Sequence, residues 1–133
     1  MKSRTAAWTG IAALGDVLIL ILFAAIGRLS HHRSMASPVE DVLVTALPFL
    51  AGWAAGAGLG GGYSAVIWTR RRVMLSRTAR SWITGGLIAL VIRSFLERRV
   101  VPLSFAAVVL TFNLVLLSAW RLALGIIRSR VEP

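Results

Sequence analysis

Four long apolar runs, separated by short polar or basic segments, dominate the pattern of the chain. The runs cover about residues 8–28, 40–62, 81–97 and 102–122. A helix needs about 20 predominantly apolar residues to cross the hydrocarbon core of a bilayer. The pattern therefore predicts an all-α fold, in which a single membrane domain, residues 1–133, is an integral membrane bundle of four transmembrane helices.

The first apolar run carries one acid, Asp16, in its middle. On a helix, Asp16 shares a face with the small residues Ala12 and Ala13, which is the kind of face that packs on other helices. An ionisable group at that depth is costly and needs a partner, so Asp16 is the first candidate functional residue. A cleaved signal peptide is the alternative, but the run is too long for one and contains the acid.

The second run opens with a typical helix start. Ser37 and Glu40 have the spacing of a capping box, and Pro38 stands at the first helical position. Pro48 is expected to kink this helix. Small residues recur on one face of the second and third runs, at Gly52, Gly56, Gly60, Gly86 and Ala89. Such faces allow helix backbones to approach closely, so the pattern predicts tight helix packing there.

Composition supports a membrane protein and excludes several chemistries. Hydrophobic residues make up 57% of the chain, charged residues only 15%, and the mean hydropathy is +0.79. This exceeds what a soluble domain of this size needs for its core. The chain has no cysteine, which excludes disulfides, thiol nucleophiles and thiolate metal sites.

The net charge of +10 could indicate a nucleic acid partner. The basic residues flank the apolar runs, however, instead of lining a hydrophilic face. Anionic lipid headgroups on the inner face of the bilayer are therefore the expected counter-charge, and no nucleic acid partner is expected.

The distribution of basic residues predicts an orientation. With the N-terminus inside, five of the 15 Lys and Arg residues lie outside, namely Arg28, Arg33, Arg93, Arg98 and Arg99. The other ten lie inside, several of them in a basic cytoplasmic loop at residues 69–80. The positive-inside rule then places both termini in the cytoplasm. This topology also puts four of the five tryptophans near the inner interface: Trp8, Trp68, Trp82 and Trp120.

Two further polar residues of the apolar runs fall near the depth of Asp16. Arg93 and Asn113 are predicted to join it in an intramembrane cluster, in which Arg93 neutralises Asp16 and Asn113 adds hydrogen bonds. A second interpretation stays open: Arg93 extends outward to Glu97, four residues along the same helix face. Asp16 would then be buried without a cation and free to titrate.

Titratable residues also gather in a predicted polar loop on the outer side, formed by Arg28, His31, His32, Glu40 and Asp41. A solvated loop at headgroup level that responds to pH is the expected role. A metal site is not expected, because adjacent histidines do not easily face one ion. The glycines at residues 58–62 lack the preceding strand of a phosphate-binding loop. No catalytic motif occurs, so the sequence predicts neither an enzyme nor a cofactor.

Residues spread over all four runs resemble a known family. They are Asp16, the stretch FAAIGR at residues 23–28, His31, Pro48, Phe49, Trp53, Trp82, Thr84, Arg93, Ser104, Phe105, Trp120 and Arg121. Together they resemble an uncharacterised four-span membrane family of bacteria and haloarchaea, domain of unknown function 3054. The resemblance implies a four-helix membrane fold in a bacterial or archaeal plasma membrane and no particular activity. Ala89 stands where the resemblance leads us to expect Gly.

Two classes of function remain open. The first is a non-enzymatic helical bundle that acts as a subunit or accessory of a larger assembly. In this class the pair of Asp16 and Arg93 fixes the helix register, and the glycine face of the second run meets a second copy or another membrane protein. The second is a small oligomeric proton-coupled transporter or channel that uses Asp16. In outline this second class is similar to the small multidrug-resistance transporters, which are four-span chains with an acid in the first span.

Overall fold

The computed structural model describes residues 2–30 and 37–133, and within these ranges all regular secondary structure is helical. The elements are α1 (Lys2–Ser30), α2 (Pro38–Gly60), the short 3-10 helix η1 (Ala65–Trp68), α3 (Arg71–Glu97) and α4 (Leu103–Val131). The four α-helices are all long and apolar enough to span a membrane. The predicted all-α fold with four membrane-length helices is therefore confirmed.

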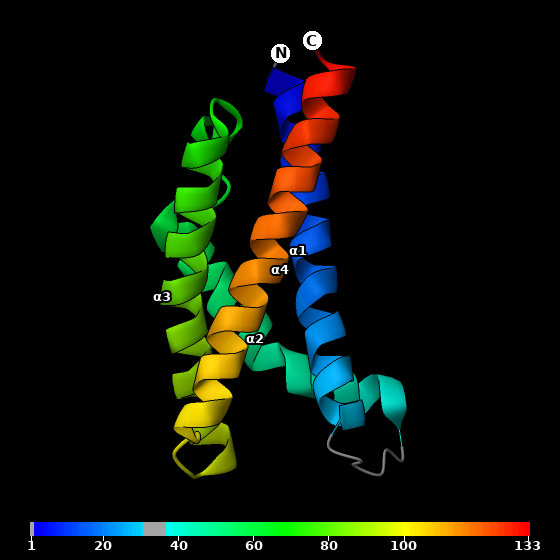
Figure 1. Cartoon of the computed structure of the whole chain (residues 1–133). Helices are drawn as coiled ribbons and strands as arrows, with labels where there is room; N and C mark the ends of the chain where they lie inside the picture. Colours follow the sequence, from blue (N-terminus) through cyan, green and yellow to red (C-terminus); the bar gives the residue numbers. More distant parts are fainter. Residues whose placement is uncertain (1, 31–36) are drawn as a thin grey trace.

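The four α-helices form one bundle (Figure 1). Both termini lie at the same end, and the connection between α3 and α4 lies at the opposite end. α1 and α4 run side by side, while α2 crosses obliquely behind α4 and packs most extensively against α3. Below, we refer to the two ends as the terminal end and the distal end.

The helices extend beyond the predicted spans at the terminal end. α1 and α4 each contain 29 residues. At 1.5 Å per residue each is roughly 43 Å long, more than the hydrocarbon core of about 30 Å. Residues 71–80, predicted to lie in a basic loop, instead form the first turns of α3. They are helical because Met74 and Thr78 face inward and are buried among the other elements.

α2, by contrast, ends inside the bundle. Gly61 closes it with a left-handed backbone conformation (φ 67°), which glycine adopts without steric penalty. The end of α2 packs against Ser81, since a Cβ atom placed on Gly60 would lie 2.6 Å from the Ser81 hydroxyl. Ser81 is ten residues into α3, about 15 Å from its first residue. Residues 61–70, which are irregular apart from η1, therefore connect the end of α2 inside the bundle to the start of α3 at the terminal end.

The glycines of α2 allow its backbone to touch α3. A Cβ atom on Gly52 would lie 2.3 Å from the carbonyl oxygen of Gly85 and 2.7 Å from the Ala89 side chain. The predicted close contact at Gly52 is therefore confirmed, and Gly56 and Gly60 make the same kind of contact with α3. Gly86 faces α4 instead, where its nearest neighbour is Leu110.

Aromatic side chains fill the space on either side of this contact. Phe49 is buried and meets the Phe23 ring edge-on, with 5.6 Å between the ring centres. Trp53 is buried beside Trp82, with ring centres 6.3 Å apart. Pro48 is also buried, and α2 continues through it as far as Gly60. The α2 helix is thereby fixed in place between α1 and α3.

The contact between α2 and α3 can be tested with Gly56→Ala. The added methyl group would lie 2.2 Å from the carbonyl oxygen of Ser81, so the helices must separate. We expect the free energy of unfolding to fall by about 1–3 kcal/mol, as for other overpacked sites. Thermal unfolding in detergent micelles, followed by the near-ultraviolet signal of the tryptophans, measures this.

Gly58→Ala is the matched control, because nothing lies within 4 Å of a Cβ atom at Gly58. This change should leave stability unchanged or raise it slightly, since alanine favours helix more than glycine does. Equal stability of the two variants would contradict the close contact of α2 with α3.

Candidate functional site

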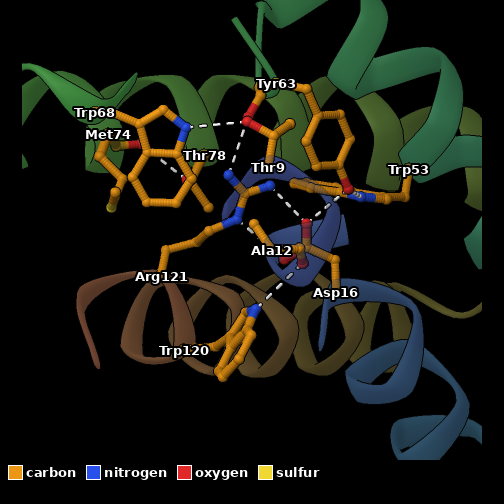
Figure 2. Close-up of polar contacts among 11 residues, drawn as sticks. Thr9, Ala12, Asp16, Trp53, Tyr63, Trp68, Met74, Thr78, Trp120 and Arg121 are labelled. Atoms are coloured by element: carbon orange, nitrogen blue, oxygen red, sulfur yellow. Dashed lines mark hydrogen bonds and ion pairs between the residues drawn. The ribbon is translucent and has the colours of Figure 1, made fainter. Parts of the chain in front are cut away.

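The candidate site is centred on an ion pair between Asp16 of α1 and Arg121 of α4 (Figure 2). Both side chains have an exposed fraction of 0%. The Arg121 guanidinium donates two hydrogen bonds, from Nε to Oδ1 at 3.1 Å and from Nη2 to Oδ2 at 2.5 Å. Two parallel bonds of this kind are the strongest geometry for an arginine and a carboxylate.

Tyr63 and Trp53 extend the ion pair into a chain of hydrogen bonds. The Tyr63 hydroxyl donates to Asp16 Oδ2 at 2.6 Å, and the Trp53 indole donates to the Tyr63 hydroxyl at 2.7 Å. The Tyr63 ring also lies beside the guanidinium of Arg121, 4.9 Å from its centre to Cζ. Each hydroxyl, indole and carboxylate group of the chain therefore has a partner, as buried polar groups require.

Arg121 also holds the irregular backbone that follows α2. Its Nη1 donates to the carbonyl oxygen of Gly62 at 3.0 Å. Carbonyl groups beyond a helix end have no partner within the helix, and bare ones are not tolerated at membrane depth. One guanidinium therefore satisfies both the buried acid and the interrupted backbone.

Tryptophans connect the helices on either side of the ion pair. The Trp120 indole donates to the carbonyl oxygen of Ala12 at 3.3 Å, and its ring fills the space that Gly15 leaves open. The Trp68 indole donates to the Thr9 hydroxyl at 3.1 Å, which joins η1 to α1 (Figure 2). α1 is thus fixed to α4 and to η1.

A second, more exposed pair lies at the end of α4. Arg128 stacks over the Trp68 ring, 4.8 Å from the ring centre, and donates to Glu132 at 3.2 Å. A hydrogen bond from Trp8, followed by that from Arg128, lowers the pKa of the Glu132 carboxyl below its ordinary value. Arg128 Nη2 also donates to the Thr5 hydroxyl at 3.5 Å, which links the end of α4 to the start of α1.

The predicted pairing of Asp16 with Arg93 is wrong, because Arg121 bonds to both carboxylate oxygens. Arg93 pairs with Glu97 at 2.7 Å, which confirms the contact of the second interpretation. That interpretation also implied that no cation lies beside Asp16. This part is wrong, because Arg121 lies there. Asn113 is buried, but its amide donates to the Val109 carbonyl oxygen at 3.0 Å and not to Asp16.

The predicted polar loop is brought together only in part. Arg28 lies 3.6 Å from Asp41 and donates to the Thr45 hydroxyl at 2.9 Å. Glu40 is exposed in the first turn of α2. His31 and His32 lie outside the described residues. Within residues 2–30 and 37–133, no group of three His, Cys, Asp or Glu residues could hold a metal ion.

The roles of Arg121 and Tyr63 were missed from the sequence. Arg121 was placed at the membrane interface because it follows Trp120, whereas α4 continues for ten residues beyond it. One signal was available from the sequence: Arg121 follows Asn113 by eight residues, which puts both polar side chains on the same face of a helix. In the structure that face of α4 is the buried one. Tyr63 carries no comparable signal, because it lies in the irregular segment between α2 and η1.

Fold and site together define a bundle of four membrane-length helices that is tied internally by a buried ion pair. The chain belongs to the family described as protein of unknown function (DUF3054), whose model matches residues 13–124. The predicted resemblance is confirmed, and Asp16, Tyr63 and Arg121 all fall within the matched region. No curated protein and no solved structure matches the chain.

The predicted family positions separate into two groups in the structure. Trp53, Trp120 and Arg121 belong to the hydrogen-bonded network around Asp16. Phe49 and Phe105 lie instead against the Arg93 guanidinium near the distal end, with ring centres 5.9 and 4.9 Å from its Cζ. The distal group is therefore a second place where aromatic rings and arginine meet.

Tyr63→Phe tests the hydrogen-bonded chain. The change deprives Asp16 of a donor and the Trp53 indole of its acceptor, both in a buried setting. We expect the free energy of unfolding to fall by about 1–3 kcal/mol, the usual cost of leaving a buried polar group unpaired. Thr69→Val is the control, because it removes an exposed hydroxyl that bonds only to the nearby Val66 carbonyl. If both changes shift the unfolding temperature equally, the chain does not stabilise the fold.

Proposed function

We propose that this protein is a non-enzymatic helical bundle of the plasma membrane that serves as a subunit or accessory of a larger membrane assembly. The Asp16–Arg121 pair is in this proposal a permanent structural element. The observation that carries it is the complete engagement of the Asp16 carboxylate, which two guanidinium bonds and one hydroxyl bond occupy at zero exposure.

This geometry argues against a proton-carrying role for Asp16. A carboxyl group that moves protons must exchange them with water and lose its cation in part of the cycle. Here the cation is also anchored to the Gly62 carbonyl, so moving Arg121 away would expose backbone as well as charge. Breaking a buried ion pair costs about 3–5 kcal/mol. The subunit proposal requires no such step.

The charge distribution supports a membrane orientation with both termini in the cytoplasm. At the terminal end α1 and α3 begin and α4 ends (Figure 1). The described basic residues in or next to these helix ends are Lys2, Arg4, Arg70, Arg71, Arg72, Arg77, Arg80, Arg128 and Arg130. Those at the distal end are Arg28, Arg93, Arg98 and Arg99. The positive-inside rule favours the terminal end as the inner one, facing anionic lipids of a bacterial or archaeal plasma membrane.

The surface for a partner is not the glycine face of α2. That face was expected to meet another protein or a second copy, but Gly52, Gly56 and Gly60 pack against α3 of the same chain. A partner subunit would therefore contact the bundle elsewhere.

Proton flux measurements separate the subunit proposal from the transporter. Purified protein in liposomes with an internal pH dye should show no more flux under an imposed pH gradient than empty liposomes. Asp16→Asn should lower stability and leave flux unchanged, while Glu40→Gln, at an exposed acid, should change neither. If the native protein conducts protons and a folded Asp16→Asn variant does not, the subunit proposal fails.

Co-purification tests the subunit proposal directly. Gentle solubilisation of native membranes that contain the tagged chain should recover a second membrane protein or a second copy in constant ratio. Recovery of the monomer alone, at every detergent concentration that keeps the bundle folded, would overturn the proposal.

A further inference from the structure

A cavity of about 320 Å³ lies between the helices at the distal end of the bundle, away from the Asp16–Arg121 pair. All four α-helices contribute to its described wall: α1 through Phe23 and Arg28, α2 through Phe49, α3 through Arg93 and α4 through Phe105. Phe23 is seven residues from Asp16, which is about 10 Å along α1. The cavity is therefore separate from the buried ion pair.

The polar part of the wall carries more positive than negative charge. Arg28, Arg93 and Arg99 line the cavity together with a single acid, Glu97. That one carboxylate is shared, at 2.7 Å from Arg93 and 3.2 Å from Arg99. A wall with three guanidinium groups and one carboxylate favours an anion.

The contacts of Arg28 leave one of its hydrogen-bond donors available for such an anion. Its Nη1 donates to Thr45, and its Nη2 forms an ion pair with Asp41 at 3.6 Å, which is too long for a hydrogen bond. Its Nε is buried and has no hydrogen-bond partner among the described residues. A buried donor without a partner is costly, and an anionic oxygen at this wall would supply one.

The remaining wall is aromatic. The Phe49 and Phe105 rings flank the Arg93 guanidinium, and Phe23 packs edge-on against Phe49. A fully hydrated ion gains nothing from such a surface, whereas an apolar group attached to the anion buries it favourably. The distal end of a membrane-spanning bundle is also the level at which lipid headgroups meet their acyl chains.

We infer that this cavity binds the anionic group of an amphiphile, a phosphate or carboxylate joined to an apolar chain. The guanidinium groups of Arg28 and Arg99 contact the anion, and the phenylalanine rings contact the first carbons of the chain. Two sources share this chemistry: an anionic phospholipid of the surrounding leaflet and a water-soluble amphipathic anion.

Binding to the purified full chain in a neutral detergent tests the inference. Native mass spectrometry would count bound phosphatidylglycerol and phosphatidylcholine of identical acyl chains, and a thermal-shift titration would compare octyl phosphate with octanol. We expect phosphatidylglycerol to bind at least about tenfold more tightly than phosphatidylcholine, because the choline cation cancels the charge of the phosphate and is repelled by the arginines of the wall. Selective binding of octyl phosphate without that lipid preference would identify a soluble anion as the source.

Variants of the wall locate the binding. Arg28→Gln and Arg99→Gln should each weaken anion binding about tenfold, and Arg99→Gln keeps the test valid if Arg28→Gln does not fold, because Arg99 is 63% exposed. Arg98→Gln is the matched control, since Arg98 is exposed at the same end and does not line the cavity. Equal binding of charged and uncharged amphiphiles, or equal losses in Arg98→Gln and the wall variants, would overturn the inference.

Discussion

The buried ion pair between Asp16 and Arg121 is the interaction on which the rest of the structure depends. Neither charge is tolerated alone at membrane depth, so the two side chains fix α1 against α4. The same guanidinium bonds to the Gly62 carbonyl just beyond the end of α2. An interrupted helix inside a membrane is possible only where other groups satisfy its backbone. The ion pair and the early end of α2 are therefore parts of one arrangement.

Packing between α2 and α3 positions the remaining members of the network. The glycines at residues 52, 56 and 60 bring the backbone of α2 into contact with α3. This approach holds Trp53 in place, and the turn at Gly61 then directs Tyr63 back toward Asp16. A sequence feature that looked like a surface for other proteins instead builds the internal site. The distal cavity is formed by the same four helices but by different residues, so the two sites can be altered separately.

Much of the fold could be predicted because hydropathy decides it. Apolar runs of membrane length fix the four helices, and small residues at four-residue spacing fix a close contact. Asp16 could be recognised as a candidate site residue, because an acid in an apolar run of this length is costly and needs a partner. Its partner could not be identified by depth alone, because a tryptophan such as Trp120 is typical of the membrane interface and Arg121 follows it directly. In the structure α4 continues to Val131, which puts both residues well inside the helix. The position of the Tyr63 side chain depends on where α2 ends, and helix ends are poorly determined by sequence.

The most direct test of the central role of the ion pair is a double-mutant cycle on Asp16→Asn and Arg121→Gln, with unfolding free energies measured in lipid bicelles. Each single change should lower stability by about 3 kcal/mol or more, because it leaves one buried charge unpaired. The double variant should recover part of the loss, with a coupling energy of about 1.5 kcal/mol or more. A parallel cycle on Arg128 and Glu132, both partly exposed, should give less than about 1 kcal/mol. Additive effects of Asp16→Asn and Arg121→Gln, within about 0.5 kcal/mol, would contradict the dependence of the bundle on this pair.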